Sequence, residues 1–120
     1  MNRWALIEHR VYSVAQIEIH FDFLLESQND CLTWKMFEIP KLDGNRTEIL
    51  PHSNHRKNWL SITHQILSRN RGEVNQIDNG KYNIIENSLA DEDFILKLNG
   101  NLLSGFFKKK ANLCELCTNF

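Results

Sequence analysis

The chain has 120 residues, a mass of 14.1 kDa and a net charge of −1, with 14 Lys and Arg against 15 Asp and Glu. Two hydrophobic cores would each be too small at this length, so we expect residues 1–120 to form a single domain. An apolar fraction of 42% and a charged fraction of 24% exclude collagen-like, low-complexity and disordered classes. Because the net charge is close to zero, any binding to nucleic acid must come from a local basic patch.

The cellular setting is predicted from apolar runs and cysteines. No apolar run approaches the roughly 20 residues that cross a bilayer, and the N-terminal residues do not open a signal peptide. Cys31, Cys114 and Cys117 are an odd number and make a poor disulfide framework, which favours free thiols. We therefore expect a cytoplasmic, monomeric protein with no membrane partner. Cys114 and Cys117 have zinc-knuckle spacing but lack a second ligand pair, so residues 111–120 are predicted to be a flexible tail.

The first predicted elements are β-strands. Trp4–His9 is a short apolar run typical of a strand. Residues 17–26 alternate almost without interruption, which is the strongest strand signal in the chain. One face is expected to join the core and carries Ile17, Ile19, Phe21, Phe23 and Leu25. The opposite face carries Glu18, His20, Asp22, Leu24 and Glu26.

The middle of the chain predicts a hairpin partner followed by a loop. Leu32, Trp34 and Met36 alternate after the turn residues 28–30, so they are expected to pair with the preceding strand. Residues 43–58 are polar and fit neither a strand nor a helix period, which predicts a long surface loop.

The second half of the chain predicts two further hairpins. Residues 59–67 fit either a strand or a short helix. Asn79-Gly80 and Asn99-Gly100 are dipeptides that favour two-residue hairpin turns, the first between strands at 74–77 and 82–86. Residues 88–93 could hold a helical turn, and Lys108–Lys110 is expected to be a solvated strand end. About eight short strands predict a mainly β fold, a small antiparallel barrel or sandwich with short helical segments.

His20 and Asp22 are two residues apart on a predicted strand and must therefore point to the same side. A divalent cation accepts a neutral His nitrogen and an Asp oxygen, and His9 at the end of the previous strand could supply a third ligand. The sequence therefore admits a two-His, one-carboxylate metal site. The alternative is that His20 and Asp22 lie only on the solvent-exposed side of a half-exposed strand.

Several short stretches, taken in chain order, resemble one known family. They are His9, His20–Glu26, Leu32–Trp34, Pro40–Lys41, His55–Trp59, Arg71–Val74, Asp78–Tyr82 and Leu98–Gly105. The family is the phosphoesterase module of bacterial DNA ligase D, also called the DNA polymerase ligase N-terminal domain. Its pattern reads roughly H-x-A, H-Y-D-x-R-x-E, L-x-S-W and P-K, with H-x-x-x-Y, G-x-V, D-x-G-x-Y/W and L-x-G-x-x-L-x-G downstream. The resemblance spans residues 3–110.

The resemblance implies a compact antiparallel β-barrel that uses Mn²⁺, or alternatively Zn²⁺, to heal DNA or RNA 3′ ends in DNA repair and end joining. A terminal ribonucleoside and then a 3′-phosphate would be removed, alongside a partner ligase or polymerase. The metal ligands then fall on His9, His20 and Asp22, and His55 would face the phosphate oxygens as a catalytic group. Arg56, Arg71 and Trp59 are further candidates for contacts with phosphate or nucleic acid.

Two departures from the family pattern bear on catalysis. Leu24 stands where the family has an arginine, and a leucine cannot neutralise the charge of a phosphoryl transition state. Trp59 replaces a tyrosine and keeps the ring, but its indole NH can only donate. Arg10, Arg56, Arg69 and Arg71 are candidates for the missing cation. The alternative function is therefore an inactive module that binds nucleic-acid ends, and Leu24→Arg is expected to raise any residual activity.

Overall fold

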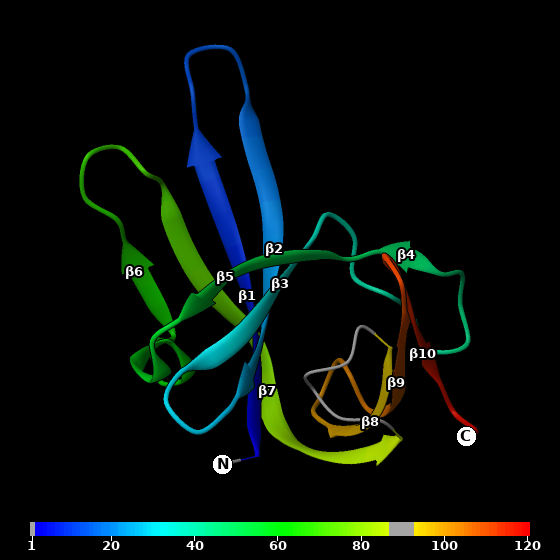
Figure 1. Ribbon diagram of the computed structural model, residues 1–120. Helices are drawn as coiled ribbons and strands as arrows, with labels where there is room; N and C mark the ends of the chain where they lie inside the picture. Colours follow the sequence, from blue (N-terminus) through cyan, green and yellow to red (C-terminus); the bar gives the residue numbers. More distant parts are fainter. Residues whose placement is uncertain (1, 87–92) are drawn as a thin grey trace.

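The computed structural model describes residues 2–86 and 93–120 (Figure 1). These residues form one sheet of ten antiparallel strands with no α-helix, which confirms the predicted mainly β class. The elements in chain order are β1 Arg3–Tyr12, β2 Ile17–Glu26, β3 Cys31–Met36, β4 Thr47–Glu48, β5 Leu50–His55, the 3-10 turn η1 Lys57–Leu60, β6 His64–Ile66, β7 Glu73–Glu86, β8 Phe94–Asn99, β9 Gly105–Lys110 and β10 Leu113–Cys117. Within the described ranges, no helix is long and apolar enough to cross a membrane.

The predicted closed barrel is wrong. The strands lie in the order β4-β10-β9-β8-β7-β1-β2-β3-β5, and β6 adds to β7 beside this path. The two end strands, β4 and β5, are separated in the chain only by Ile49, yet no ladder among the described residues joins them. Ile49 is fully buried and donates its backbone N–H to Asn112 O at 2.9 Å. The chain therefore crosses from one end of the sheet to the other at Ile49, and this covalent crossing takes the place of a closing ladder.

The main core lies inside the curve of this sheet. Its aromatic rings pack closely, with Phe23 stacked on Phe107 at 4.7 Å and Trp34 edge-on to Phe94 at 5.3 Å. Phe23 and Leu25 are fully buried there, as their alternation predicted. The other core members are Trp4, Leu6, Met36, Ile49, Tyr82, Leu96, Leu98, Leu103, Cys114 and Leu116. At the start of β2 the predicted core face is instead exposed, because the β1–β2 hairpin extends beyond the rest of the sheet (Figure 1).

A second, smaller core covers the opposite face of β1, β2 and β3. Leu24 and Cys31 are fully buried there, and η1 supplies Leu60 as a cover. The remaining buried members are Ala5, Ile7 and Val74. The β1–β2 pair is therefore buried on both faces over its lower half, although strict alternation is the pattern of a strand with one solvated face. The candidate site described below lies on this same face of β1 and β2.

Three segments differ from their predicted structure. Residues 43–58, expected to be a loop, contain β4 and β5, whose polar side chains are largely exposed while their backbones complete the sheet. The segment 59–67 contains the end of the 3-10 turn η1 followed by the strand β6. Both the helical turn and the strand that were expected as alternatives are therefore present, one after the other. Residues 113–117, expected in a flexible tail, form β10, which pairs with β9 and β4. Lys109, expected at a solvated strand end, is buried with its Nζ over the Phe94 ring.

Asn79-Gly80 does not form the predicted turn. Both residues lie inside β7, which runs through the two strands expected on either side. A Cβ atom at Gly80 would come within 1.7 Å of the carbonyl oxygen of Asn99 and 3.0 Å of Trp4 Nε1. Glycine is therefore required there for close approach of neighbouring groups. Asn99-Gly100 does begin a hairpin connection, but Leu98 pairs with Gly105, so the loop is longer than two residues. The helical turn considered at 88–93 falls almost wholly outside the described residues.

Arg3 and Glu26 form the clearest pH-dependent contact of the fold. The Arg3 guanidinium donates to both carboxylate oxygens of Glu26, at 3.3 Å and 2.8 Å. The Glu26 side chain is only 7% exposed, and the hydrogen bond from Arg3 lowers its pKa from 4.5 to about 2 despite the opposing effect of burial. A carboxyl group with a lowered folded-state pKa stabilises the fold above its unfolded pKa, and this stability is lost as the pH falls towards the folded value.

Glu26→Gln is accordingly expected to cost about 2 kcal/mol of unfolding free energy at pH 7, after allowance for the half-exposed Arg3. Wild-type stability should fall between about pH 5 and pH 2, and the variant should lack that part of the fall. Urea unfolding across this pH range measures both effects. Parallel pH profiles for the two proteins would show that the ion pair contributes nothing.

Candidate metal centre

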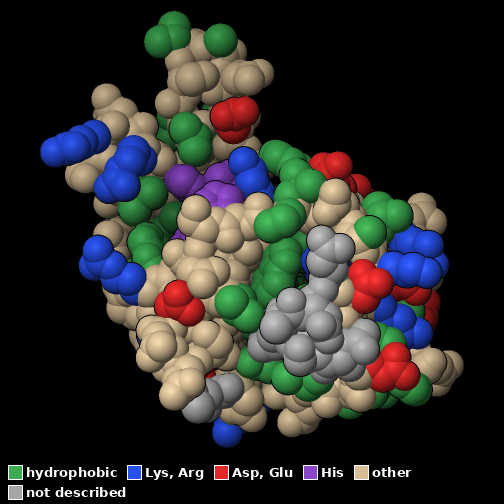
Figure 2. Space-filling model, in the orientation of Figure 1, with side chains coloured by type: hydrophobic (Ala, Val, Ile, Leu, Met, Phe, Trp, Pro, Cys, Tyr) green, Lys and Arg blue, Asp and Glu red, His purple; other side chains and the backbone are tan. Residues whose placement is uncertain are grey.

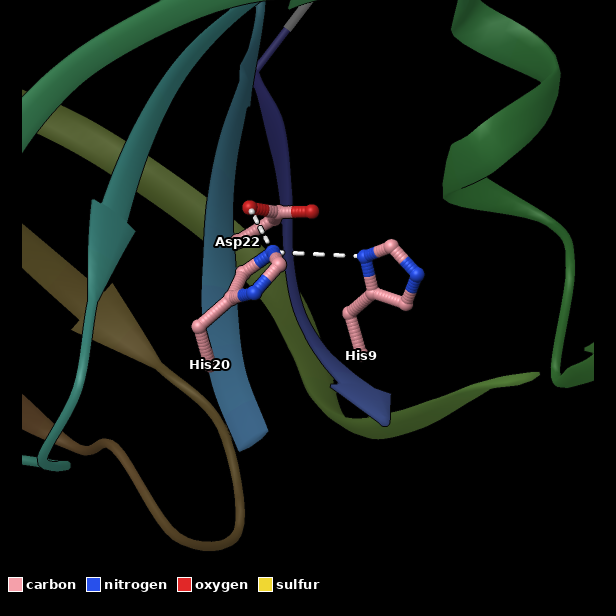
Figure 3. Close-up of side chains that lie close together, drawn as sticks. All are labelled: His9, His20 and Asp22. Carbon is pink, nitrogen blue, oxygen red and sulfur yellow. Dashed lines mark hydrogen bonds and ion pairs between the residues drawn. The ribbon is translucent and has the colours of Figure 1, made fainter. Parts of the chain in front are cut away.

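The β1–β2 ladder brings together the three predicted metal ligands. His9 pairs directly with His20 across the ladder, and Asp22 lies two residues further along β2 on the same face. His9 Nδ1 is 3.3 Å from His20 Nε2, which is 3.4 Å from Asp22 Oδ1. The three side chains point toward one another from adjacent strands (Figure 3), and one potential ligand atom from each lies within 4.8 Å of the others. The expectation that these residues meet is confirmed.

The ring of His9 is held in one orientation by the loop before β7. Its Nε2 lies 2.9 Å from the carbonyl oxygen of Arg71, and a carbonyl can only accept, so Nε2 carries the proton in the neutral ring. Nδ1 then presents its lone pair to His20 and Asp22. Gly72 allows this close approach, since it has φ +93° and a Cβ there would lie 1.8 Å from Arg10 O. This backbone contact has no signature in the amino-acid sequence.

Asp22 is a buried carboxylate with an unsatisfied oxygen. The residue is 4% exposed, and Oδ1 accepts no hydrogen bond among the described residues, because its 3.4 Å contact with His20 Nε2 lacks hydrogen-bond geometry. Burial works to raise the pKa of Asp22, but its interaction with the His20 ring and the smaller effects of His55 and His52 outweigh it. The net pKa therefore lies below the usual value, and Asp22 is ionised near neutral pH. The burial of Asp22 also argues against the alternative in which His20 and Asp22 are only the solvent-exposed side of a strand.

These residues fit a divalent cation. Two ligands bound at about 2.1 Å to one tetrahedral ion are separated by about 3.4 Å. His20 Nε2 lies at about this distance from His9 Nδ1 and from Asp22 Oδ1, and the three ligand atoms all lie within 4.8 Å of one another. Two imidazole nitrogens and one carboxylate oxygen form a donor set that Zn²⁺ and Mn²⁺ both accept. A cation at the centre would also bind Asp22 Oδ1, the buried oxygen that has no hydrogen-bond donor among the described residues. The structure thus supports His9, His20 and Asp22 as a possible metal-binding group.

His55 approaches the same group from β5. Its Nδ1 lies 3.2 Å from Ser53 O and 3.1 Å from Thr33 Oγ1, so Nδ1 is the donor to the Ser53 carbonyl. Its Nε2 is then turned toward Asp22, with 3.6 Å to Oδ2. The Trp59 ring stands edge-on to His55 at 5.9 Å. His55 is therefore oriented by β3 and β5 so that one nitrogen faces the metal-binding group.

A histidine-rich patch marks this place on the surface. Histidine side chains gather below the projecting hairpin and are flanked by Lys and Arg side chains (Figure 2). His52 adds to this patch, with its ring 5.8 Å from that of His55. Sequence reasoning did not include His52 in the site, because an isolated histidine in a polar segment is most often a surface residue.

The candidate arginines do not reach the three ligands. Arg10 is bound to Glu8 at 2.6 Å, and the Arg71 guanidinium donates to Ser68. Arg56 and Arg69 are exposed. Among the described residues, no guanidinium forms a hydrogen bond or ion pair with His9, His20 or Asp22. The predicted phosphate contacts of Arg56, Arg71 and Trp59 remain predictions.

Leu24 lies on the same strand face as Asp22, in the second core, and is fully buried. An arginine there would place a guanidinium in the same apolar cluster as Ile7, Leu60 and Val74. Leu24→Arg is now expected to lower the unfolding free energy by about 3 kcal/mol, measured by chemical denaturation, in place of raising activity. Unchanged stability would mean that the guanidinium reaches a site outside this core. An activity assay of Leu24→Arg would then test whether the substitution raises activity.

Comparison with protein-family models and with curated proteins finds no match to this chain. The resemblance to the ligase D phosphoesterase module therefore rests on the order of the short motifs. The geometry of His9, His20 and Asp22 is an independent observation.

Proposed function

We propose that this protein is a divalent-cation-dependent 3′-phosphoesterase that removes a 3′-phosphate or 3′-terminal ribonucleotide from DNA or RNA, like the ligase D family that it resembles. The observation that carries the proposal is the convergence of His9, His20 and Asp22, with their ligand atoms within 4.8 Å and one buried carboxylate oxygen lacking a donor. The proposed setting is cytoplasmic DNA repair and end joining, with a ligase or polymerase as partner. Mn²⁺ is the proposed cation, with Zn²⁺ as the alternative.

The residues divide the work of such a reaction. A bound cation would polarise the phosphoryl group and lower the pKa of a bound water. Arg71 O keeps the proton of His9 on Nε2, so that Nδ1 remains free to bind the cation. Asp22 supplies the negative charge, and its burial strengthens the attraction to the cation. His55, when protonated on Nε2, can donate to a phosphate oxygen or to the leaving group, because Nδ1 is already held by Ser53 O.

A second candidate is a binding module for nucleic-acid ends that lacks turnover. It is favoured by the buried Leu24 at the position of the family arginine and by the distance of other guanidinium groups from the ligands. Without a cation aimed at the phosphate oxygens, an enzyme loses a main source of transition-state stabilisation. The metal-binding group could then serve only to hold a terminal phosphate.

An assay of phosphate release separates these functions. Purified protein with Mn²⁺ is mixed with an oligonucleotide that bears a 3′-phosphate, and Asp22→Ala is compared with the exposed control Asp43→Asn. The enzyme predicts turnover that falls at least about 100-fold in Asp22→Ala and is unchanged in the control. Binding of the oligonucleotide without turnover would support the module. Absence of both binding and turnover would contradict both functions.

A further inference from the structure

A cleft opens between two hairpins that project beyond the sheet. The β1–β2 hairpin and the β6–β7 hairpin stand side by side at one end of the molecule (Figure 1). The cleft between them has a volume of about 810 Å³ and is lined by Tyr12, Val14, Ile66, Leu67 and Gly72, among others. Val14 is fully exposed, and Ile66 and Tyr12 are 75% and 48% exposed. Contiguous apolar side chains at such exposure mark a surface that binds something.

The cleft meets the metal-binding group at the loop before β7. Tyr12 is three residues beyond His9 on β1, about 10 Å along an extended strand, and its side chain points to the opposite face of the strand from His9. The loop that forms the other wall also contacts His9, since Arg71 O lies 2.9 Å from His9 Nε2 and Gly72 lines the cleft. A ligand that places one end at His9 would therefore follow this loop past the end of the β1–β7 ladder, at Arg10 and Glu73, to enter the cleft.

The charge at the rim favours an anionic ligand. Arg69 and Arg71 are exposed on the β6–β7 hairpin, and neither guanidinium forms an ion pair with a carboxylate of the described residues. The acidic residue that lines the cleft, Glu73, is already engaged, because it accepts from the Tyr12 hydroxyl and lies 3.0 Å from His64 Nε2. The wall thus combines apolar side chains and an aromatic ring with two exposed guanidinium groups. Arg71 donates to Ser68 within its own loop, but no carboxylate of the described residues neutralises either charge.

We propose that this cleft binds the single-stranded nucleotides that precede a 3′ end, with a base against Tyr12 and the backbone phosphates at Arg69 and Arg71. Aromatic rings that accept the flat faces of bases, next to cations that accept phosphates, are the parts of a single-strand site. An apolar peptide would use the walls but would leave both guanidinium groups without an anionic partner. The inference rests on the proposed function, because the strand would present its 3′ end to the metal-binding group.

Fluorescence anisotropy with a labelled single-stranded oligothymidylate carrying a 3′-phosphate tests the charged part of the cleft. EDTA is present, so that binding is measured without cation or hydrolysis. The double variant Arg69→Ala/Arg71→Ala is expected to lower affinity about tenfold and to reduce the slope of log K against log salt by about 1.4, the loss of two phosphate contacts. The matched double variant Lys41→Ala/Lys110→Ala removes the same charge from exposed positions outside the cleft and should change neither quantity.

Tyr12→Leu tests the apolar part. It removes the ring but keeps an apolar side chain, and it is expected to lower affinity about fivefold with an unchanged salt slope. Its melting temperature is measured alongside, since the Tyr12 hydroxyl also donates to Glu73. An affinity loss that persists below the melting transition with the slope preserved supports stacking in the cleft.

The outcomes separate this inference from the proposed function. Binding that is weakened by the arginine and tyrosine variants, without turnover in Mn²⁺, supports the cleft and contradicts the enzyme. Turnover in Mn²⁺ with oligonucleotide affinity unaffected by all these variants overturns the cleft and leaves the enzyme standing. Concentration-dependent dimers that Ile66→Ser abolishes, together with no oligonucleotide binding, would also overturn it, because the cleft would then hold a second copy of the chain.

Discussion

Adding Mn²⁺ or Zn²⁺ to the purified protein at about 100 times its dissociation constant is expected to raise the melting temperature by about 10 °C. A ligand that binds only the folded state at this concentration adds about 2.7 kcal/mol to the unfolding free energy. For a chain of this length, each kcal/mol corresponds to about 4 °C. The stabilisation is expected because the cation would bind Asp22 Oδ1, a buried carboxylate oxygen with no hydrogen-bond donor among the described residues. Differential scanning calorimetry with and without EDTA measures the shift.

Two variants and one control make this result specific. Asp22→Ala and His9→Gln each remove a ligand atom, and both are expected to abolish the metal-dependent shift. His52→Gln removes a neighbouring imidazole that is exposed and outside the three-residue group, so its shift should equal that of the wild type. An equal shift in Asp22→Ala would assign the metal to other residues. A wild-type protein that no divalent cation stabilises would contradict the metal centre altogether.

The metal-binding group could be predicted because it depends on local geometry. Strand alternation fixed the common side of His20 and Asp22, and a hairpin between consecutive strands brought His9 opposite His20. The groups that orient these ligands could not be predicted in the same way. Arg71 O reaches His9 across 62 residues, and it is a backbone atom with no sequence signature. The family resemblance implied only that His55 would face the phosphate oxygens. Its position beside Asp22 could not be predicted, because β3 and β5 pair segments that no sequence period links.

The burial of Leu24 marks a limit of pattern reasoning. Alternation assigns a strand one core face, yet here η1, together with Ile62 and Leu67, covers the opposite face and completes a second core around Leu24. That cover comes from a segment more than thirty positions away whose own period is ambiguous. The sequence therefore predicts the strand correctly but not that both of its faces are buried. The functional consequence is direct, because the same burial removes the physical basis for restoring an arginine at this position.

Turn chemistry misled the prediction where tertiary contacts prevailed. Asn79-Gly80 is a strong hairpin signal, but both residues lie within the long strand β7, next to Asp78 and close to the Trp4 side chain. The N–H of Asn79 is bonded by the Asp78 carboxylate, and the absence of a Cβ at Gly80 admits Asn99 O. Local preference of a dipeptide amounts to about 1 kcal/mol, which a buried ionic hydrogen-bond network can exceed.

Asp78 is the centre of that network. The residue is 4% exposed, and its carboxylate accepts four backbone N–H groups. Oδ1 accepts from Asn79 at 2.9 Å and Asn101 at 3.0 Å, and Oδ2 accepts from Leu102 at 2.7 Å and Leu103 at 2.8 Å. Three of these donors belong to the β8–β9 connection, which has no ladder of its own to satisfy them. The carboxylate thus accepts the hydrogen bonds that a partner strand would otherwise accept, and it holds Leu103 in the main core.

Asp78→Asn is expected to lower the unfolding free energy by about 4 kcal/mol, because each hydrogen bond to a charged group contributes about 1.5–3 kcal/mol and an amide offers one acceptor oxygen for four donors. Such a loss is a large share of the stability of a small domain. The matched control Asp43→Asn alters a carboxylate that binds Thr118 at an exposed site, and it should cost less than about 1 kcal/mol. Urea denaturation at pH 7 compares the two variants. Similar small losses in both would mean that the loop backbone finds other partners and that Asp78 does not hold the β8–β9 connection.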